Sequence, residues 1–394
     1  MVDARSNIYE ILESCPECDE FLFPFKESID RETTLYSLAT KLDISVEALQ
    51  YGIARTQKRA EQNPCDYEKM RAKLIKPNHI NVAGFVNFLW QNQFIEELQN
   101  EARRLNIALN LNIFPKHTKK ELQNYLAICN NPDDLPEVLI GKGFSSLMTQ
   151  SFVTKFVKSG LYKHPSVCDS IGSVFAESGL VDEGENYHPF GVEEVILLHD
   201  KTIPFDQELP TSWPELLQPR YAGSIMQMGK SQRDHFGFNI MLHLYHTLGR
   251  EGVEGYAANV MNKQHFAYII KNIAQNNPES APISVVHQFA SKFIPSDLKH
   301  DTEIIKTTDG NPCTTIFFLM KQNTSPQAIE LIKHLYSPQI REIIERCGTS
   351  HITSKKSMSG NTKLQWVGWE KIKELPLPYL KEELSELAFL KYKQ

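Results

Sequence analysis

A Gly-Lys-Ser triplet at residues 229–231 is the motif in this 394-residue chain that most directly suggests a chemical function, namely phosphate binding. A phosphate-binding P-loop has a glycine, four residues and then Gly-Lys-Ser/Thr, so that backbone N–H groups surround a phosphate. Here five residues separate Gly223 from Gly229, and they have the apolar character of a strand. The spacing therefore argues against a nucleotide site. A strand that ends near Met228 and a helix that begins near Gln232 would still present free N–H groups to an anion.

The side chains of this turn add hydrogen-bond donors. Lys230, Ser231 and Arg233 suit a small oxyanion or a carboxylate. Asp234 and His235 would instead bind a cation or an amine group. The alternatives are that Ser231 only caps the helix, that Arg233 is solvated, and that Asp234 only favours the first helical turn through the dipole.

Three further turns follow expected strands, at 83–85, 141–146 and 287–292. In open α/β sheets, ligand pockets form at the carboxyl ends of strands, so these turns and the 229–235 turn are expected to line one cleft. His287 is interpreted either as a ligand-binding group or as a satisfied structural histidine. The expected ligand-binding residues are Lys142, Gly143, Ser145, Gly229, Lys230, Ser231, Arg233, Asp234, His235, His287, Gln288 and Ser291.

Strands that alternate with helices from residue 80 onward position these turns, and they predict βαβ units in a mostly parallel sheet. The amphipathic pattern of residues 1–62 predicts a small helical domain, in which Ser45 caps a helix. The polar segment 63–79 is interpreted as a linker, and 363–394 as one or two amphipathic helices. Phe88 and Trp90 have helical spacing typical of core residues, with an aromatic wall of the pocket as the alternative.

Composition and charge bear on the partners and the location of the protein. The formal net charge of −6 gives no general attraction to nucleic acid or anionic membranes. No stretch reaches the roughly 18 apolar residues of a membrane span, so no membrane insertion is expected. The first residues lack a basic-then-apolar signal, and the seven cysteines are scattered, which together predict a cytoplasmic protein.

Cys15 and Cys18 form a CxxC pair, which can be redox-active or supply half of a zinc site. No second CxxC or nearby CxxH completes a tetrahedral set, so buried free thiols are the favoured interpretation. A metal or redox adaptor centred on these cysteines is the alternative.

Several stretches carry a family resemblance. The stretch 208–228, "ELPTSWPELLQPRYAGSIMQM", is similar to the pattern P-x-x-W-x-x-L-x-x-P-x-[YF]-x-G-x-I, and "GVEEVILLHDK" resembles a strand that crosses between two lobes. Both patterns, with the late segment "KQNTSPQAIELIKHLYSPQIREIIERCG", belong to type II periplasmic substrate-binding proteins of ABC transporters. The most similar branch binds ferric iron, thiamine and small anions or carboxylates. Residues 1–60 resemble a small helical domain of unknown function that also occurs fused to redox and metabolic proteins.

The resemblance implies an α/β fold of two lobes, 80–188 with 286–394 and 189–285, that close on a ligand between them. It implies a small-molecule ligand (an oxyanion, a carboxylate or a metal complex), an ABC permease or a regulatory protein as partner, no resident cofactor and no catalysis. Iron-binding members carry adjacent tyrosines after the strand that corresponds to "ISVVHQF", whereas this chain continues "ASKF". With no export signal expected, the role is that of an intracellular sensor or a transport-related protein. An enzyme on the same scaffold is the alternative, although HExxH, GxSxG and GxGxxG are absent from the sequence.

Overall fold

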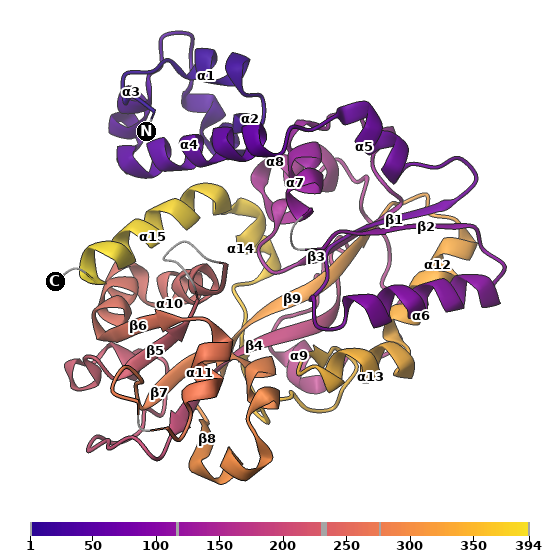
Figure 1. Ribbon diagram of the computed structural model, residues 1–394. Coiled ribbons are helices and arrows are strands. Elements are labelled where there is room, and N and C mark those ends of the chain that lie inside the picture. Colours follow the sequence, from indigo (N-terminus) through magenta and orange to yellow (C-terminus); the bar gives the residue numbers. More distant parts are fainter. Residues whose placement is uncertain (1, 116–117, 230–234, 276, 393–394) are drawn as a thin grey trace.

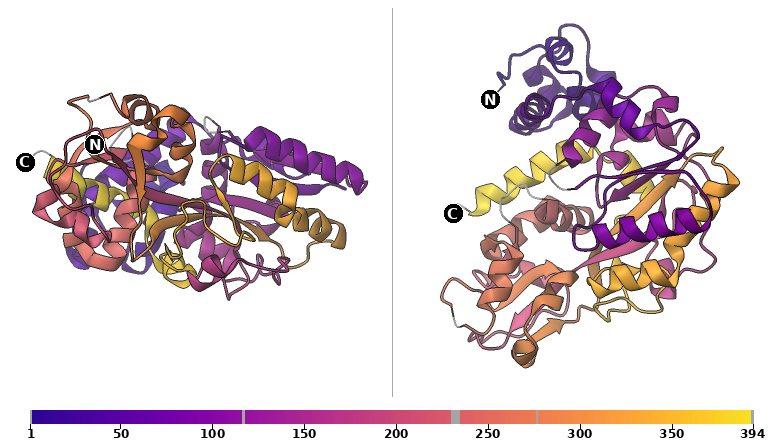
Figure 2. Two further views of the ribbon diagram at one scale, coloured as in Figure 1. Left: turned by 90° about the horizontal axis from the view of Figure 1, so that it is seen from below. Right: turned by 45° about the vertical axis from the view of Figure 1, so that its right-hand side comes forward.

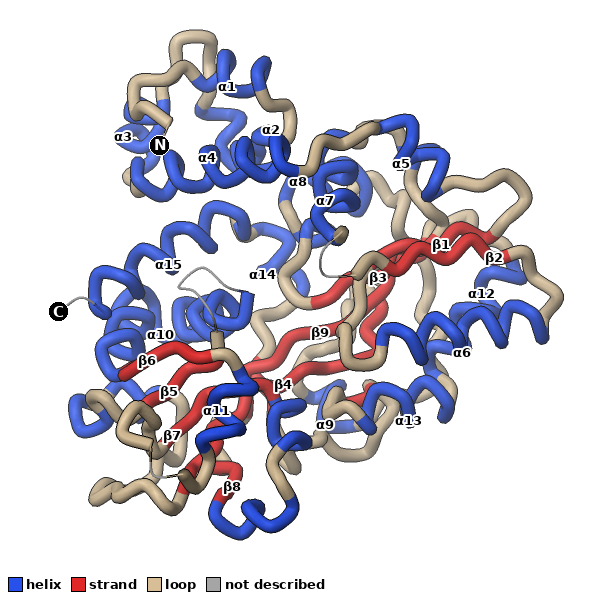
Figure 3. Tube along the Cα trace, viewed as in Figure 1, coloured by secondary structure: helices blue, strands red, loops and turns tan. Residues whose placement is uncertain are grey.

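A mixed β-sheet runs through the two halves of the molecule (Figures 1 and 3). The computed structural model describes residues 2–115, 118–229, 235–275 and 277–392. The order of the main strands is β2-β1-β3-β9-β4-β7-β5-β6. The strands are β1 (Ile80–Gly84), β2 (Leu109–Ile113), β3 (Val138–Lys142), β4 (His188–Asp200), β5 (Ile225–Met228), β6 (Val260–Gln264), β7 (Ile283–His287), β8 (Thr302–Ile305), β9 (Asn311–Met320), β10 (Ser350–His351) and β11 (Leu364–Gln365).

The strand β4 joins the two halves of the sheet. Its first part pairs antiparallel with β9, and its second part, from Val195, pairs antiparallel with β7 and β8. The outer strands on each side pair parallel, β1 with β2 and β3, and β5 with β6 and β7. The architecture expected from the sequence, α/β with two lobes after a helical N-terminal region, is confirmed.

Helices cover both halves of the sheet (Figure 1). They are α1 (Ile8–Ser14), α2 (Cys18–Leu22), α3 (Leu35–Leu42), α4 (Val46–Gln62), α5 (Tyr67–Leu74), α6 (Gln91–Arg104), α7 (Lys119–Ile128), α8 (Gln150–Phe152), α9 (Ser173–Glu177), α10 (His235–Asn259), α11 (Phe266–Asn272), α12 (Pro326–Lys333), α13 (Pro338–Arg346), α14 (Trp369–Glu374) and α15 (Leu377–Tyr392).

The N-terminal helices α1 to α4 bury a core of their own, and α15 contributes Tyr379 to it. Ser45 caps α4 as expected, since its side chain accepts a hydrogen bond from the Ala48 N–H. The Ser45 N–H donates to the Tyr379 hydroxyl at 2.9 Å. Arg55 of α4 forms an ion pair with Glu382 of α15 at 2.7 Å. The helical N-terminal region is therefore docked on α15, as the right-hand view in Figure 2 shows.

Two segments have more structure than their sequences indicated. The expected linker 63–79 contains α5, which Asp66 caps and whose Met70 and Leu74 are buried in the large core. In the C-terminal tail, α15 packs along both α10 and α4. It therefore lies between the helical N-terminal region and the part of the chain expected as the second lobe.

Candidate functional site

Four polar side chains meet where β4 passes from one half of the sheet to the other, and we call them the hinge cluster: Asn87, Lys142, Glu193 and His287. The Lys142 ammonium lies 2.8 Å from Glu193 Oε1, and Asn87 Nδ2 donates to the same oxygen at 2.6 Å. Strand register places His287 near Glu193, because the Cα of His287 pairs with that of Val195, which lies two residues after Glu193 on β4. Lys142 and His287 were expected at one site, and the structure brings them together around Glu193.

Burial shapes the charges in the hinge cluster. Burial raises the pKa of Glu193, but the charge of Lys142 and its hydrogen bonds outweigh this effect and hold the pKa below the ordinary value. Burial lowers the pKa of His287 to about 4, and Lys142 acts in the same direction while Glu193 opposes it. At neutral pH the hinge cluster therefore contains one ammonium, one carboxylate and a neutral imidazole.

Two atoms of the hinge cluster are buried without a hydrogen-bond partner in the described part of the chain. They are Glu193 Oε2 and His287 Nδ1. Glu193 is 4% exposed and His287 9%. Because a buried unpaired polar atom costs about 1–3 kcal/mol, these two atoms mark a place where a bound solute could contribute hydrogen bonds.

A left-handed glycine sets the direction of the turn that follows Lys142. Gly143 has φ of 56°, and its N–H donates to the Thr315 carbonyl at 2.8 Å. The chain then turns so that Phe144 stacks on Trp366, with ring centroids 5.9 Å apart. Only glycine adopts this backbone conformation at little cost, which explains its place in the turn.

The other predicted residues lie apart from the hinge cluster. Gln288 and Ser291 bond to each other, at 3.2 Å between Nε2 and Oγ, and Gln288 Nε2 also donates to the Met358 carbonyl. Gly229 directly follows β5, and its N–H donates to the Gln264 carbonyl at 2.8 Å. His235 begins α10.

The central residues of the opening motif cannot be placed. Lys230, Ser231, Arg233 and Asp234 lie outside the described residues. Their proposed role at the site therefore stays a prediction.

Ser145 lines a different space, which we call the junction cavity. This cavity of about 350 Å³ lies between the helical N-terminal region, α7, the turn 144–149 and α15. Its wall also includes Phe238 of α10, whose ring meets that of Phe144 edge-on with centroids 5.9 Å apart.

Sequence reasoning missed the two carboxylates of β4. Glu193 points to the hinge cluster, while its neighbour Glu194 is 1% exposed and accepts hydrogen bonds from Asn311, Ser350 and Ser359. The signal was two adjacent acids inside the otherwise apolar strand "VEEVILL". Burying charges is costly unless they are paired, so such a pair within a strand indicates built polar surroundings.

Two further expectations are settled by burial. Trp90 is fully buried, as expected, whereas Phe88 is 59% exposed, so the prediction of a core position for Phe88 is wrong. Phe88 lies on the turn after β1, before α6 begins, and is therefore outside the helical pattern that suggested burial. Cys15 and Cys18 are buried and form no disulfide, and their burial agrees with the favoured interpretation.

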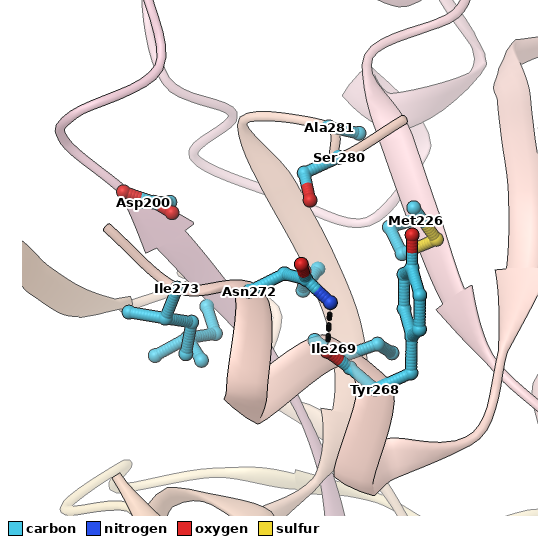
Figure 4. Close-up of a pocket in the computed structure, with 10 residues that line it drawn as sticks. Asp200, Met226, Tyr268, Ile269, Asn272, Ile273, Ser280 and Ala281 are labelled. Carbon is cyan, nitrogen blue, oxygen red and sulfur yellow. Dashed lines mark hydrogen bonds between the residues drawn. The ribbon is translucent and has the colours of Figure 1, made fainter. Parts of the chain in front are cut away.

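A second pocket lies among β4, β5, β7 and α11, and Figure 4 shows the side chains around it. Its volume is about 10 Å³, which is room for about one water molecule. Asp200 at its edge already accepts hydrogen bonds from Thr202 and from the Ala274 N–H. This pocket is too small for a solute.

The described residues show neither a metal-binding cluster nor a membrane-spanning helix. Among them, no group of three or more His, Cys, Asp or Glu side chains is arranged to hold a metal ion. None of their helices combines the length and the apolar character that crossing a bilayer requires.

Comparison with known proteins identifies the fold and the family. A model of the family described as bacterial extracellular solute-binding protein matches residues 133–375. The apo ferric ion-binding protein A of Pasteurella haemolytica has a TM-score of 0.55 at 14% identity, over 80% of this chain and 98% of that one. A Trichodesmium IdiA (FutA) solved with iron and citrate ligands gives 0.57 at 12%, over 79% and 99%. Iron-bound HitA of Pseudomonas aeruginosa gives 0.54 at 10%, over 80% and 99%. A search of curated protein sequences found no match.

The family match overturns one expectation. The cytoplasmic location predicted from the N-terminal residues and the cysteines is wrong, because the matching family consists of extracellular proteins. Scattered thiols and a polar first stretch were therefore poor indicators of compartment. The role of an intracellular sensor loses its basis with them.

Proposed function

Because this chain belongs to the bacterial extracellular solute-binding proteins, we propose that it is a receptor that closes two lobes on a small solute at the hinge cluster. The proposed lobes are 80–188 with 286–394 and 189–285. Strands that run through both halves, β4 above all, would act as the hinge. An ABC permease is the partner that this role implies. The family and the fold are those of binding proteins rather than of enzymes.

The observation that supports this site is the pair of buried, unpartnered atoms Glu193 Oε2 and His287 Nδ1. They come from different strands, and only the register of β4 against β7 brings them close. A solute that hydrogen-bonds to both would supply the partners that these two atoms lack among the described residues. Binding would thereby favour the conformation in which both atoms face it.

The chemistry of the hinge cluster supports a hydroxycarboxylate or a similar small anion. A carboxylate oxygen such as Glu193 Oε2 only accepts hydrogen bonds, so the solute has to offer a donor such as a hydroxyl group. The Lys142 side chain is 31% exposed and would pair with a carboxylate or oxyanion of the solute. We propose that the turn containing Lys230, Ser231 and Arg233 adds further donors from the second lobe.

A ferric complex of such a carboxylate is the second candidate. The observation in its favour is the shared fold with a protein solved in complex with iron and citrate. The segment Gln288–Phe293, "QFASKF", contains no tyrosine. On this proposal iron would therefore arrive as a chelate held through its carboxylates, not through phenolate ligands of the protein.

Differential scanning fluorimetry with citrate, ferric citrate, phosphate, sulfate and thiamine tests the proposal. A solute present at 100 times its Kd should stabilise the protein by about 2.7 kcal/mol. The His287→Gln variant should bind that solute at least tenfold more weakly, while the exposed-site control His300→Gln should bind it as the wild type does. A panel without any stabilising solute, or equal affinities of the two variants, would contradict the proposal.

The same preparation separates a receptor from an enzyme. After incubation with the stabilising solute, mass spectrometry should recover the solute chemically unchanged. Conversion to a product that His287→Gln fails to form would favour the enzyme instead.

A further inference from the structure

We propose that the junction cavity is a second binding site, for a small anion that carries at least two negative charges. It goes beyond the solute receptor proposed above, because the cationic side chains around the cavity lie outside the part of the chain that the family model matches. Those side chains are Arg55, Lys58, Arg59, Lys119, Lys120 and Lys381.

The size and position of the cavity suit a ligand of this kind. Its volume of about 350 Å³ falls within the range of small-molecule sites. Its walls come from α2 and α4 of the helical N-terminal region, from α7, from the turn 144–149 and from the first turns of α15. A ligand there would contact segments far apart in the sequence.

The charge of the lining is strongly positive. Six basic side chains face two acidic ones, a formal surplus of four, in a chain whose net charge is −6. Both acids are already paired: Glu20 with Arg59 at 3.3 Å, and Glu382 with Arg55 at 2.7 Å. The two acids therefore leave Lys58 and Lys120 without an acidic partner in the described part of the chain, and one anionic charge on a ligand would leave the lining formally positive.

Lys58 and Lys120 are the clearest part of that surplus. Both are exposed at the cavity rim, on α4 and α7. Neither has a hydrogen bond or an ion pair with any residue whose position the structure describes. Two cations that line one cavity from separate helices attract a divalent anion more than a monovalent one.

Buried donors inside the cavity point to the same ligand. Ser146 is 7% exposed and its Oγ has no hydrogen-bond partner among the described residues. The Oγ of Ser145 and the Nε of Arg59 are likewise buried and unpartnered. A hydroxyl and a guanidinium N–H both donate to phosphate or carboxylate oxygens, so an anion would satisfy what the protein leaves unpaired.

Isothermal titration calorimetry on the full chain tests this site with pyrophosphate, tricarballylate and acetate at low salt. Tricarballylate is a tricarboxylate without a hydroxyl group, which separates it from the hydroxycarboxylates proposed for the hinge cluster. We expect pyrophosphate, tricarballylate or both to bind, and acetate to bind at least tenfold more weakly. Binding of pyrophosphate alone would identify a phosphate ligand, and binding of tricarballylate alone a polycarboxylate.

A charge-matched pair of variants locates the binding. Lys58→Gln with Lys120→Gln should weaken binding of the polyanion at least tenfold, because both lysines line the cavity and have no partner among the described residues. Lys355→Gln with Lys356→Gln removes the same charge from an exposed segment away from the cavity and should change the affinity less than twofold. Equal losses in both double variants would show attraction to net charge alone and overturn the proposal.

Two other results would also overturn it. One is the absence of any binding of either polyanion by the wild type at millimolar concentration. The other is a complete loss of polyanion binding in Lys142→Gln while the Lys58 and Lys120 double variant still binds the polyanion. The anion would then occupy the hinge cluster and not the junction cavity. The first of these results does not depend on whether the hinge cluster binds its own solute.

Discussion

Exchange of Lys142 for methionine would leave the Glu193 carboxylate, 4% exposed at its side chain, without the cation that lies 2.8 Å away. The reverse exchange, Glu193→Gln, leaves an ammonium group that is 31% exposed and can turn toward water. The glutamine also keeps an oxygen that can accept the hydrogen bond from Asn87. The two single substitutions therefore remove the same ion pair but leave very different groups behind.

The magnitude follows from that asymmetry. Breaking a fully buried ion pair costs about 3–5 kcal/mol, whereas an exposed pair contributes about 0.2–1 kcal/mol. Lys142→Met strands the buried partner, so we expect it to cost about 3 kcal/mol. Glu193→Gln strands the solvated partner and should cost about 1–2 kcal/mol. The double variant should be close to Glu193→Gln alone, which corresponds to a coupling energy of about 3 kcal/mol.

Urea unfolding of the wild type, both single variants and the double variant at pH 7 measures the cycle. The exposed pair of Arg346 and Glu342 on α13, with side chains 62% and 71% exposed, is the control, and its coupling should stay below about 0.5 kcal/mol. At pH 4 the penalty of Lys142→Met should shrink, since burial favours protonation of the stranded Glu193. A coupling energy below about 0.5 kcal/mol for the hinge pair, or a larger penalty for Glu193→Gln than for Lys142→Met, would refute the reasoning.

Three further substitutions test the packing and the buried charges by equilibrium unfolding. Gly52→Ala should cost about 1–3 kcal/mol, because the new Cβ would lie 2.1 Å from the Phe21 ring; the gain usual for alanine in a helix would contradict this close packing. Burial lowers the pKa of His243 to about 4, so the unfolded state binds more protons than the folded state below pH 6.5. The free energy of unfolding of the wild type should therefore fall by about 3 kcal/mol from this group between pH 6.5 and pH 4, and that of His243→Gln should fall by that much less. Identical pH profiles of the two proteins would exclude the effect. Lys373→Met strands Asp182, whose side chain is 1% exposed and lies 3.1 Å from the ammonium, and should cost about 3–5 kcal/mol at pH 7; a loss below 1 kcal/mol would show that the pair is not needed.

The sequence predicted the part of the site that follows from strand ends. Lys142 and His287 were selected because each ends an apolar run, and the carboxyl ends of strands are where such folds hold ligands. Glu193 was out of reach of that rule, since it lies inside a strand. Its contact with Lys142 depends on the register of β9 with both β3 and β4, which no local pattern encodes.

Segments with little apolar character were the hardest to interpret. The helix α5 buries only Met70 and Leu74 among polar neighbours, so its sequence resembled a linker. Local periodicity also did not show which surface α15 covers, because that depends on α4 and α10, distant in the sequence. The walls of the junction cavity come from the helical N-terminal region, α7, the turn 144–149, α10 and α15, so no pattern within one segment of the chain predicts it.

The turn after β3 connects the two proposed sites. Lys142 points to Glu193 in the hinge cluster, and three residues later Ser145 lines the junction cavity. Between them Gly143 holds a left-handed conformation, and Phe144 is fixed against Trp366 and Phe238. A displacement at one end of this turn is expected to reach the other end, because closely packed side chains transmit strain. If solute binding shifts Lys142, the wall of the junction cavity shifts with it, and the helical N-terminal region is placed to bind an anion in step with the lobes.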